Sequence, residues 1–315
     1  MNEPIFSVII PNYNNGATLA RAIDSVLAQT TPAHEIIVID DGSNDRSRQV
    51  AESYGGRVRY VYQDNAGVSA ARNHGARLAT GSWLAFLDAD DVYMPGRLAA
   101  HAHWLRREPD LDFLFADQEY RSDTDEFLQM AIDASSFGRD LARRYPGRVE
   151  WPIDTTDFEA LISDGFSEIR TLSLPRTMFE QLGGFPLEYK IGEDLYFFIR
   201  LFLASKKGGV VNLPLAVYYI YPNSALRKNA LVAQAAFVAT LEALAGEMAL
   251  APAPIRRGWR AKLRQGRLSL AYMYLRAGRT AKALSVVVPL LWRDPSLRSV
   301  RDLASIARGM PKEVA

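Results

Sequence analysis

The sequence predicts an α/β fold in which a mainly parallel sheet is flanked by helices and followed by a helical C-terminal extension. Three observations predict this fold class. Short apolar runs rich in β-branched residues alternate with segments of helical period up to residue 116 of the 315-residue chain. Acidic side chains follow several of these runs. The last part of the sequence is basic and has a helical period.

The apolar runs predict strands at residues 5–10, 35–40, 57–62, 83–88 and 112–116. The segment 16–29 repeats apolar side chains along one helical face, and similar helices fit residues 65–79 and 95–107. Strands that alternate with helices form parallel sheets, in which ligands bind beyond the carboxyl ends of the strands. We therefore expect the functional residues directly after the strands, in the segments Pro-Asn-Tyr-Asn, Asp-Asp-Gly-Ser and Asp-Ala-Asp-Asp.

The charge is divided unevenly along the chain. The net charge is +1, but residues 226–315 carry 16 Lys and Arg against 5 Asp and Glu, which leaves 21 against 31 for residues 1–225. We therefore predict an acidic body, residues 1–225, and a basic helical extension, residues 226–315. Within the body, the alternation weakens after residue 125, and this divides residues 1–125 from residues 126–225.

The composition limits the chemistry. The chain has no cysteine, which excludes disulfides and thiolate metal sites, so any metal site must use oxygen or histidine ligands. A reducing compartment fits this composition. No secretory signal and no apolar stretch of membrane-spanning length is evident, so we expect a cytoplasmic protein.

Asp40 and Asp41 end the second predicted strand and precede a Gly-Ser pair. A carboxylate in this place can accept a hydrogen bond from a nucleobase or a ribose hydroxyl, and the Gly-Ser pair permits a tight turn around a nucleoside. The alternative is helix capping by Asp and Ser, and the pattern alone does not decide between the two.

Asp88, Ala89 and Asp90 follow a very apolar strand. Two carboxylates this close are costly to hold together unless a cation neutralises them, and hard oxygen ligands suit Mg²⁺ or Mn²⁺. Such a metal would also bind the phosphates of a nucleotide. A capping cluster for the following helix is the alternative.

Arg72 and Asp194 are single candidates on two further segments. A Gly-containing loop opens the helix that carries Arg72, and helix N-termini and guanidinium groups suit phosphate, although a surface arginine is usually only solvated. Asp194 precedes the apolar run 195–202. A carboxylate at the mouth of a hydrophobic helix can act as a general base toward a hydroxyl, or it can be one of an N-terminal acidic pair with Glu193.

Seven motifs, taken together and in order, resemble family 2 glycosyltransferases with the GT-A fold: SVIIPNYN, SVLAQT, EIIVIDDGSNDRS, NAGVSAARNHG, WLAFLDADDVYMPGRL, LGGF and IGEDLYFFIRL. The resemblance covers residues 5–225, and several ordered motifs are far more specific than one. It implies that a sugar moves with inversion from a nucleotide-diphosphate donor, UDP-sugars foremost, to a hydroxyl of a saccharide or lipid-linked glycan. The implied cofactor is Mn²⁺ or Mg²⁺, and the implied process is the assembly of surface polysaccharides or glycoconjugates.

The resemblance also implies a role for each candidate residue. The metal ligands would be Asp90, the surest, and Asp88, which form a DxD motif around Ala89. Asp194 would be the catalytic base. Residues 1–125 would form the nucleotide-sugar half of the body, and residues 126–225 the acceptor half. The nucleotide-sugar would be bound by Pro11, Asn12, Tyr13, Asp40, Asp41, Arg72, Asp88 and Ala89.

The sequence departs from the family pattern at one position. Many relatives place a histidine near the end of the body, where this chain has Tyr221 or Pro222. Metal coordination at that place is therefore not expected. No QxxRW-type motif is present either, so transfer of one or a few sugars is a better prediction than processive synthesis.

The basic segment 255–279 places arginines and lysines beside Trp259, Leu263, Tyr272 and Leu275. One interpretation is an amphipathic surface that meets anionic lipid headgroups, with peripheral contact to the inner face of the cell membrane. The other is a charged helical face that packs on the acidic body. Nucleic acid is not an expected partner, because the body is acidic and the tail shows no nucleic-acid-binding fold. The oligomeric state is not predicted.

Other function classes fit less well. A sugar-phosphate nucleotidyltransferase would carry a Gly-rich, Arg-containing signature after the first strand, and an NAD-dependent oxidoreductase would carry GxGxxG; PNYNNG is neither. A catalytically silent nucleotide-binding or scaffold protein with the same fold is a further alternative. The four residues Asp41, Asp88, Asp90 and Asp194 favour an enzyme.

Overall fold

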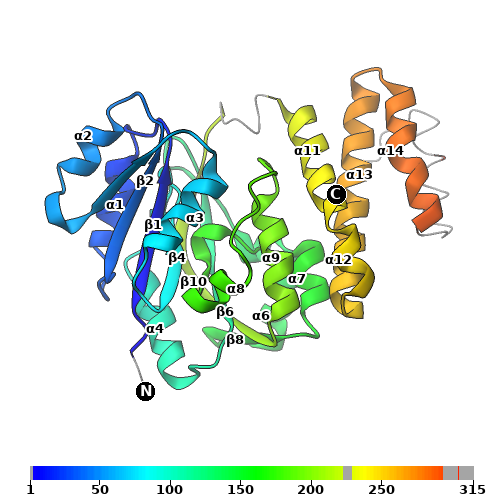
Figure 1. Cartoon of the computed structure of the whole chain (residues 1–315). Coiled ribbons are helices and arrows are strands. Elements are labelled where there is room, and N and C mark those ends of the chain that lie inside the picture. The colour runs from blue at the N-terminus through cyan, green and yellow to red at the C-terminus, as the bar shows by residue number, and fades with distance from the viewer. Residues whose placement is uncertain (1–2, 223–228, 294–303, 305–315) are drawn as a thin grey trace.

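The computed structural model describes residues 3–222, 229–293 and 304. Within these residues, the central feature is a ten-stranded sheet with helices on both faces, and further helices pack beside it at the C-terminal end (Figure 1). This arrangement confirms the predicted α/β class and the helical extension.

The first part of the sheet is parallel. Its strands lie in the order β3-β2-β1-β4. The predicted strands and helices of this region are confirmed, and short additional elements occur between them. The strands are β1 (Phe6–Asn12), β2 (Glu35–Asp41), β3 (Arg59–Gln63) and β4 (Trp83–Phe86), and the helices are α1 (Leu19–Leu27), α2 (Ser47–Glu52), α3 (Val68–Leu78) and α4 (Arg97–Arg107).

The second part of the sheet is mixed. β6 (Phe113–Ser122) and β10 (Lys207–Ile220) are parallel, whereas β9 (Ser173–Pro175) runs antiparallel between β4 and β6. Three more strands pair antiparallel: β5 (Val92–Tyr93) and β8 (Glu150–Asp154) with β10, and β7 (Phe127–Met130) with β6. The order is therefore β4-β9-β6-β10-β5, and both predicted halves of the body contribute strands to one sheet.

Side chains alternate between two hydrophobic layers, as the period of a strand requires. In β1, Val8 and Ile10 pack in the layer of α1, whereas Ile9 packs in the layer of α3. The α3 layer also includes aromatic residues of α9 (Glu193–Ala204), among them Phe197 and Phe198. Four more helices lie between β7 and α9 in the sequence: α5 (Ala131–Ala134), α6 (Ser136–Arg144), α7 (Phe158–Asp164) and α8 (Arg176–Gln181).

The extension consists of α11 (Ala230–Ala243), α12 (Ala245–Leu250), α13 (Ala253–Arg276) and α14 (Thr280–Arg293). Trp259 and Leu263 of α13 are buried in the main core, and the indole N–H of Trp259 donates to the Leu241 carbonyl at 2.8 Å. These two side chains therefore pack on the body and do not face a lipid surface. Within the described part of the chain, no helix is both long enough and apolar enough to cross a bilayer.

Candidate active site

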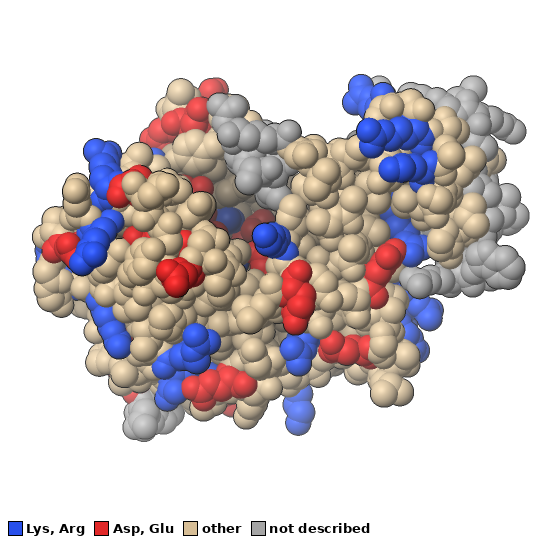
Figure 2. All heavy atoms as spheres, turned by 45° about the horizontal axis from the view of Figure 1, so that its top comes forward, with Lys and Arg blue, Asp and Glu red and all other residues tan. Residues whose placement is uncertain are grey.

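A cavity of about 670 Å³ opens beyond the carboxyl ends of β1, β2 and β4. Figure 2 shows this face of the molecule hollowed near its centre, with charged side chains inside the hollow. The volume lies within the range of ligand pockets, roughly 300–1,000 Å³. The lining includes eight of the predicted residues: Pro11, Asn12, Tyr13, Asp41, Arg72, Asp88, Ala89 and Asp90.

Asp41 shapes the wall of the cavity through its side chain. One carboxylate oxygen accepts from the Gln63 amide at 2.7 Å and from Ala66 N–H at 2.8 Å, and the other accepts from Gly67 N–H at 2.8 Å. A carboxylate has about four acceptor positions, so three donors leave capacity for one more. Asp41 can therefore hold the 64–67 loop and still accept a hydrogen bond from a ligand.

Asp40 lies outside the cavity lining. The residue is 1% exposed, and its carboxylate accepts hydrogen bonds from the Tyr60 hydroxyl at 2.7 Å and from Ser43 N–H at 3.0 Å. These contacts fix the turn after β2. Side chains of adjacent strand residues point to opposite faces, which explains why Asp41 reaches the cavity and Asp40 does not.

Asp88 is held by cations. Arg72 donates to one of its oxygens at 2.7 Å, and Arg170 lies 3.8 Å from the other. Burial opposes ionisation, but the two guanidinium groups hold the pKa of Asp88 below its ordinary value. Arg72 also pairs with Glu193 at 3.2 Å, so it links the cavity lining to the start of α9.

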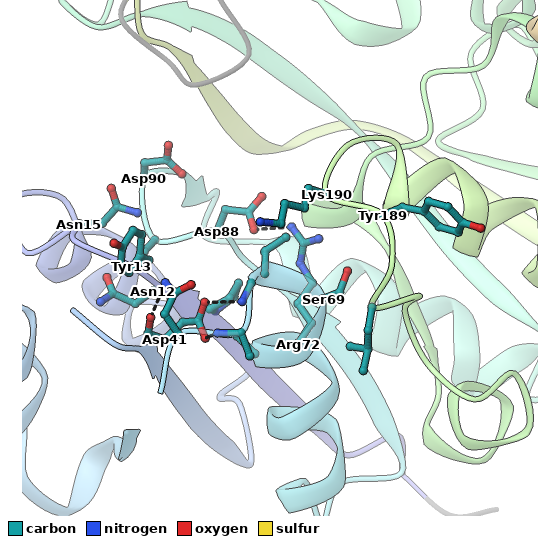
Figure 3. A pocket seen from close by; sticks show the side chains of 18 residues that line it. Asn12, Tyr13, Asn15, Asp41, Ser69, Arg72, Asp88, Asp90, Tyr189 and Lys190 are labelled. Atoms are coloured by element: carbon teal, nitrogen blue, oxygen red, sulfur yellow. Dashed lines mark hydrogen bonds and ion pairs between the residues drawn. The ribbon is translucent and has the colours of Figure 1, made fainter. Parts of the chain in front are cut away.

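Asp90 contrasts with Asp88. No side-chain hydrogen bond or ion pair joins its carboxylate to another described residue, and it lies at the cavity edge beside Asn15 (Figure 3). Burial and the charge of Asp88 raise its pKa. A carboxylate that borders a cavity and forms no ion pair within the described part of the chain fits a hard divalent cation.

A metal at this place would need ligands besides protein side chains. Among the described residues, no three His, Cys, Asp or Glu side chains come together as a metal site. Mg²⁺ commonly binds one or two carboxylates together with water and substrate phosphates, and this cavity offers Asp90 and Asp88 for that role. The residues present therefore fit a cation that arrives with a nucleotide.

Three buried polar atoms of the lining have no hydrogen-bond partner among the described protein atoms. They are Asn12 Oδ1, Ser69 Oγ and Arg72 Nε. Buried polar groups are nearly always paired, so an unpaired set around one cavity indicates a polar ligand.

The far wall of the cavity was not predicted. It comes from the loop before α9, which contributes Leu187, Tyr189 and Lys190 (Figure 3). Asn15 and the loop residues 65–68 also line the cavity. The sequence signal for these residues is weak, because loop side chains reach the cavity only through tertiary packing.

Asp194 lies beyond the cavity lining, on the first turn of α9. Gly192 precedes the helix with a φ of +78°, a conformation that glycine adopts without strain, and this turns the chain into the helix. One carboxylate oxygen of Asp194 accepts from Leu195 N–H at 2.6 Å. Its neighbour Glu193 faces Arg72, and burial, then the charge of Asp194, raises the pKa of Glu193 to about 7.

Tyr221 lies in the region where the family resemblance directs attention to a histidine. Its hydroxyl accepts from Arg21 at 3.0 Å, and the same Arg21 nitrogen donates to the Asp90 carbonyl at 2.8 Å. Tyr221 is thus joined through Arg21 to the backbone of Asp90. The following residues 223–228 lie outside the described part of the chain.

The fold places the chain among proteins with the GT-A glycosyltransferase architecture. TarS of S. aureus, residues 1–349 in complex with UDP-GlcNAc, matches with a TM-score of 0.68 and 17% identity over 96% of this chain and 90% of that chain. The mannosyltransferase PcManGT of Pyrobaculum calidifontis, in complex with GDP-Man and Mn²⁺, matches with a TM-score of 0.60 and 18% identity over 98% of this chain and 81% of that chain. At these identities, the similarity shows the fold.

Residues 7–168, just over half of the 315-residue chain, match glycosyl transferase family 2, and the chain belongs to that family. Validoxylamine A glucosyltransferase of Streptomyces hygroscopicus subsp. jinggangensis is 47% identical over 109 residues, 31% of this chain and 26% of that protein. The Escherichia coli glycosyltransferase YibD is 48% identical over 92 residues, which are 28% of this chain and 27% of that protein. A Rickettsia typhi glycosyltransferase is 38% identical over 112 residues, which are 36% of this chain and 35% of that protein. The chain thus spans at most 35% of these three relatives.

Proposed function

We propose that this protein is an inverting, metal-dependent glycosyltransferase that moves a sugar from a UDP-sugar to a hydroxyl of a saccharide or lipid-linked glycan. The observation that carries the proposal is the convergence of Asp41, Asp88 and Asp90 on one cavity, with Asp194 on the adjoining helix. The bound UDP-GlcNAc and GDP-Man of the structural neighbours support a nucleoside-diphosphate sugar as donor. UDP is proposed because the family resemblance puts UDP-sugars foremost, and the TarS structures in complex with UDP-GlcNAc and with UDP support it.

The chain's own residues suggest how the donor binds. Asp41 would accept a hydrogen bond from the base, and Tyr13, which is 52% exposed at the cavity wall, would cover its face. The unpaired Oδ1 of Asn12 would accept a hydrogen bond from a ribose hydroxyl, and the unpaired hydroxyl of Ser69 would donate to the diphosphate. Arg72 would face the diphosphate, held in place by Asp88.

Asp194 would act on the acceptor side. Its carboxylate would take the proton of the acceptor hydroxyl as that oxygen attacks the anomeric carbon from the face opposite the diphosphate, which inverts the configuration. Asp90, with Asp88, would hold Mn²⁺ or Mg²⁺, which when bound offsets the charge that grows on the departing diphosphate. The Mn²⁺ in the PcManGT complex supports this cofactor.

The extension supports a setting at the inner face of a membrane. Residues 253–293 contain ten Lys and Arg residues and no Asp or Glu. Lys and Arg side chains gather at the end of the extension where α13 meets α14 (Figure 2). Such a surface suits anionic lipid headgroups and a lipid-linked acceptor, and through it we propose a role in surface polysaccharide or glycoconjugate assembly.

Calorimetric titration of UDP, GDP and dTDP, each with and without Mn²⁺, tests the donor site. We expect one nucleotide to bind in a Mn²⁺-dependent manner to the wild type, and we expect Asp90→Ala to lose this dependence. Asp123→Ala is the matched control, because Asp123 is exposed in the β6–β7 turn, away from the cavity lining. Failure of all three nucleotides to bind the wild type would favour a silent scaffold with this fold.

A further inference from the structure

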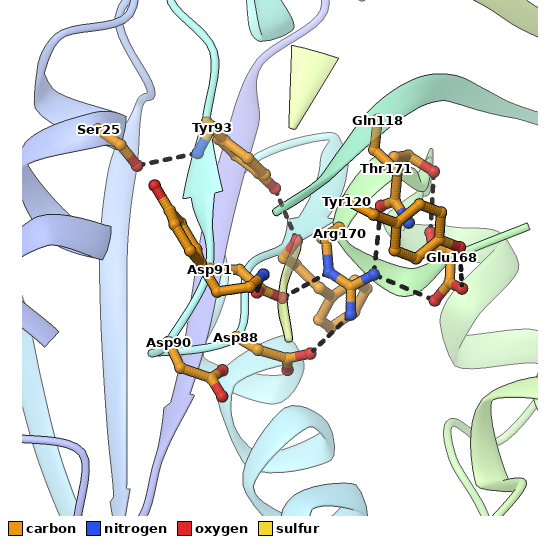
Figure 4. Close-up of polar contacts among 12 residues, drawn as sticks. Ser25, Asp88, Asp90, Asp91, Tyr93, Gln118, Tyr120, Glu168, Arg170 and Thr171 are labelled. Atoms are coloured by element: carbon orange, nitrogen blue, oxygen red, sulfur yellow. Dashed lines mark hydrogen bonds and ion pairs between the residues drawn. The ribbon is translucent and has the colours of Figure 1, made fainter. Parts of the chain in front are cut away.

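Arg170 is a buried cation that the roles proposed above leave unused. It lies in the short 3-10 turn Ile169–Thr171, and its side chain is 6% exposed. Its Nε donates to Asp91 at 2.5 Å, and one Nη contacts Glu168 at 3.1 Å. Its other Nη lies 3.8 Å from Asp88 (Figure 4). One guanidinium group therefore contacts or faces three carboxylates.

The same guanidinium group is fixed from the sheet. Nη1 of Arg170 donates to Gln118 of β6 at 3.2 Å, and the group lies 4.2 Å from the ring centroid of Tyr218 in β10. Asp91 is tied to β10 as well, because its second oxygen accepts from Tyr219 N–H at 3.2 Å. Arg170 thus joins the segment after β4 to the two central strands of the second half.

This arrangement constrains the DxD motif from one side. Asp88 faces Arg72 with one oxygen and Arg170 with the other, so its rotamer is defined by two cations. Asp91, three residues further along, is held by the Arg170 pair and is 1% exposed. Asp90 lies between these two fixed points, and its carboxylate is left at the cavity.

We propose that Arg170 is a positioning residue for the donor site: it holds Asp88 and Asp91 so that Asp90 presents its carboxylate to a divalent cation in one geometry. The inference rests on the proposed function, since it concerns the metal-nucleotide complex of that site. Catalytic and binding side chains must be held to within about 0.5 Å by their supporting contacts, and a charge-assisted pair with little exposure provides such support.

The test separates positioning from mere stability. Arg170→Lys keeps the charge but cannot reach Asp91, Glu168 and Asp88 with one planar fork. The double variant Arg170→Gln with Asp91→Asn removes both charges of the Arg170–Asp91 pair, so that Asp91 is not left as a buried carboxylate without its cation. Arg267→Lys is the control, because Arg267 is 5% exposed and pairs with Glu242 in the extension.

The measurement is calorimetric binding of UDP, GDP and dTDP over a range of Mn²⁺ concentrations, at a temperature at which every variant is folded by circular dichroism. For the nucleotide that binds, we expect both Arg170 variants to need at least about tenfold more Mn²⁺ for half-maximal binding, which is about 1.4 kcal/mol. Metal-free binding of the nucleotide and the Arg267→Lys control should be unchanged.

Three results overturn the inference. If folded Arg170 variants keep the Mn²⁺ requirement of the wild type, Arg170 does not position the site. If Mn²⁺-dependent and metal-free binding fall by the same factor, its role is general stability. If the wild type binds none of the three nucleotides, the proposed function fails, and the inference falls with it.

Discussion

Asp194 differs from Asp41, Asp88 and Asp90 because it lies outside the cavity lining, on the first turn of α9. A base of this kind should serve turnover more than donor binding. We expect Asp194→Asn to lower kcat for release of the nucleoside diphosphate about 100-fold or more, with nucleotide binding unchanged. Steady-state kinetics with the donor identified by calorimetry would measure this, with Asp123→Asn as control. Full turnover in Asp194→Asn would remove the residue from the mechanism.

Asp117 gives the protein a pH-dependent stability. Burial raises the pKa of Asp117 to about 6, against the opposing hydrogen bonds from Ile132 and Gln118 N–H. Because this pKa exceeds the ordinary value of 3.8, the folded state binds more protons than the unfolded state between these values. The stability contribution of the protonated form is therefore complete below about pH 4 and is lost as the pH rises through about 6.

Asp117→Asn tests this sign. Asn keeps an acceptor for the two backbone donors but carries no charge. Near pH 8, the free energy of unfolding of the variant should exceed that of the wild type by about 1–3 kcal/mol. Near pH 4, the two proteins should have nearly equal free energies of unfolding. Urea unfolding at both pH values measures the difference, and exposed Asp123→Asn serves as the comparison. An equal difference at both pH values would show that Asp117 does not titrate as argued.

At the residue scale, the sequence predicted the cavity residues that follow strands and missed those held by distant contacts. Asp41, Asp88 and Asp90 follow strands whose apolar pattern is strong, so their common location could be expected. Arg170 could not be placed in the same way, because it is 79 residues from Asp91 and lies in no recognisable motif. Asp40 was grouped with Asp41 as a ligand-binding residue, although a strand turns adjacent side chains to opposite faces, and Asp40 lies outside the cavity lining.

Helix α3 positions Arg72 through its close contact with the sheet. Gly75 lies on its buried face, where an added Cβ would come within 2.5 Å of Ile9 in β1. Gly75→Ala should therefore push α3 away from β1 and destabilise the protein by about 1–3 kcal/mol, with weaker nucleotide binding because Arg72 moves. Thermal unfolding and calorimetry measure both effects.

Gly246→Ala is the matched control for that helix variant. Gly246 lies in α12, and an added Cβ would meet nothing within 4 Å. Alanine is favoured over glycine in helices, so the stability should stay equal or rise by up to about 1 kcal/mol, with no change in nucleotide binding. If Gly75→Ala behaved like Gly246→Ala, the tight packing of α3 on β1 would not be what positions Arg72.

At the element scale, the strands with strong apolar runs were predictable, and of the second part of the sheet only β6 was predicted, as residues 112–116. β10 contains Gly208, Gly209 and Pro214, which are typical of turns in a sequence pattern. In the structure, the glycines allow close packing of Phe113 and Trp104 against the strand. β5 and β9 have two and three residues, too few to show an alternation.

At the scale of the whole molecule, the basic charge of the extension bears on whether the protein contacts a membrane. The apolar side of α13, with Trp259 and Leu263, is used for packing on the body, so contact with lipid would depend on the charged side. Exposed arginines include Arg276 at the end of α13 and Arg279 directly after it. Binding driven by such charges should fall steeply with salt, because exposed charges are screened within about 8–10 Å at ionic strengths of 0.1–0.15 M.

Vesicle binding decides whether this basic end meets a membrane. We expect the wild type to co-sediment with vesicles of phosphatidylcholine and phosphatidylglycerol at low salt, and to be released as salt is raised. Charge reversal of Arg276 and Arg279 to Glu should weaken binding at least about tenfold, since each basic residue contributes about 1 kcal/mol near an anionic surface. Reversal of Arg48 and Arg143, whose side chains are 69% and 71% exposed on the body, alters net charge equally and should have a much smaller effect. Equal losses in both variants would indicate that net charge alone governs the contact. If the wild type does not bind, the extension would serve only to support the body, through the contacts of α13 with α7 and α9.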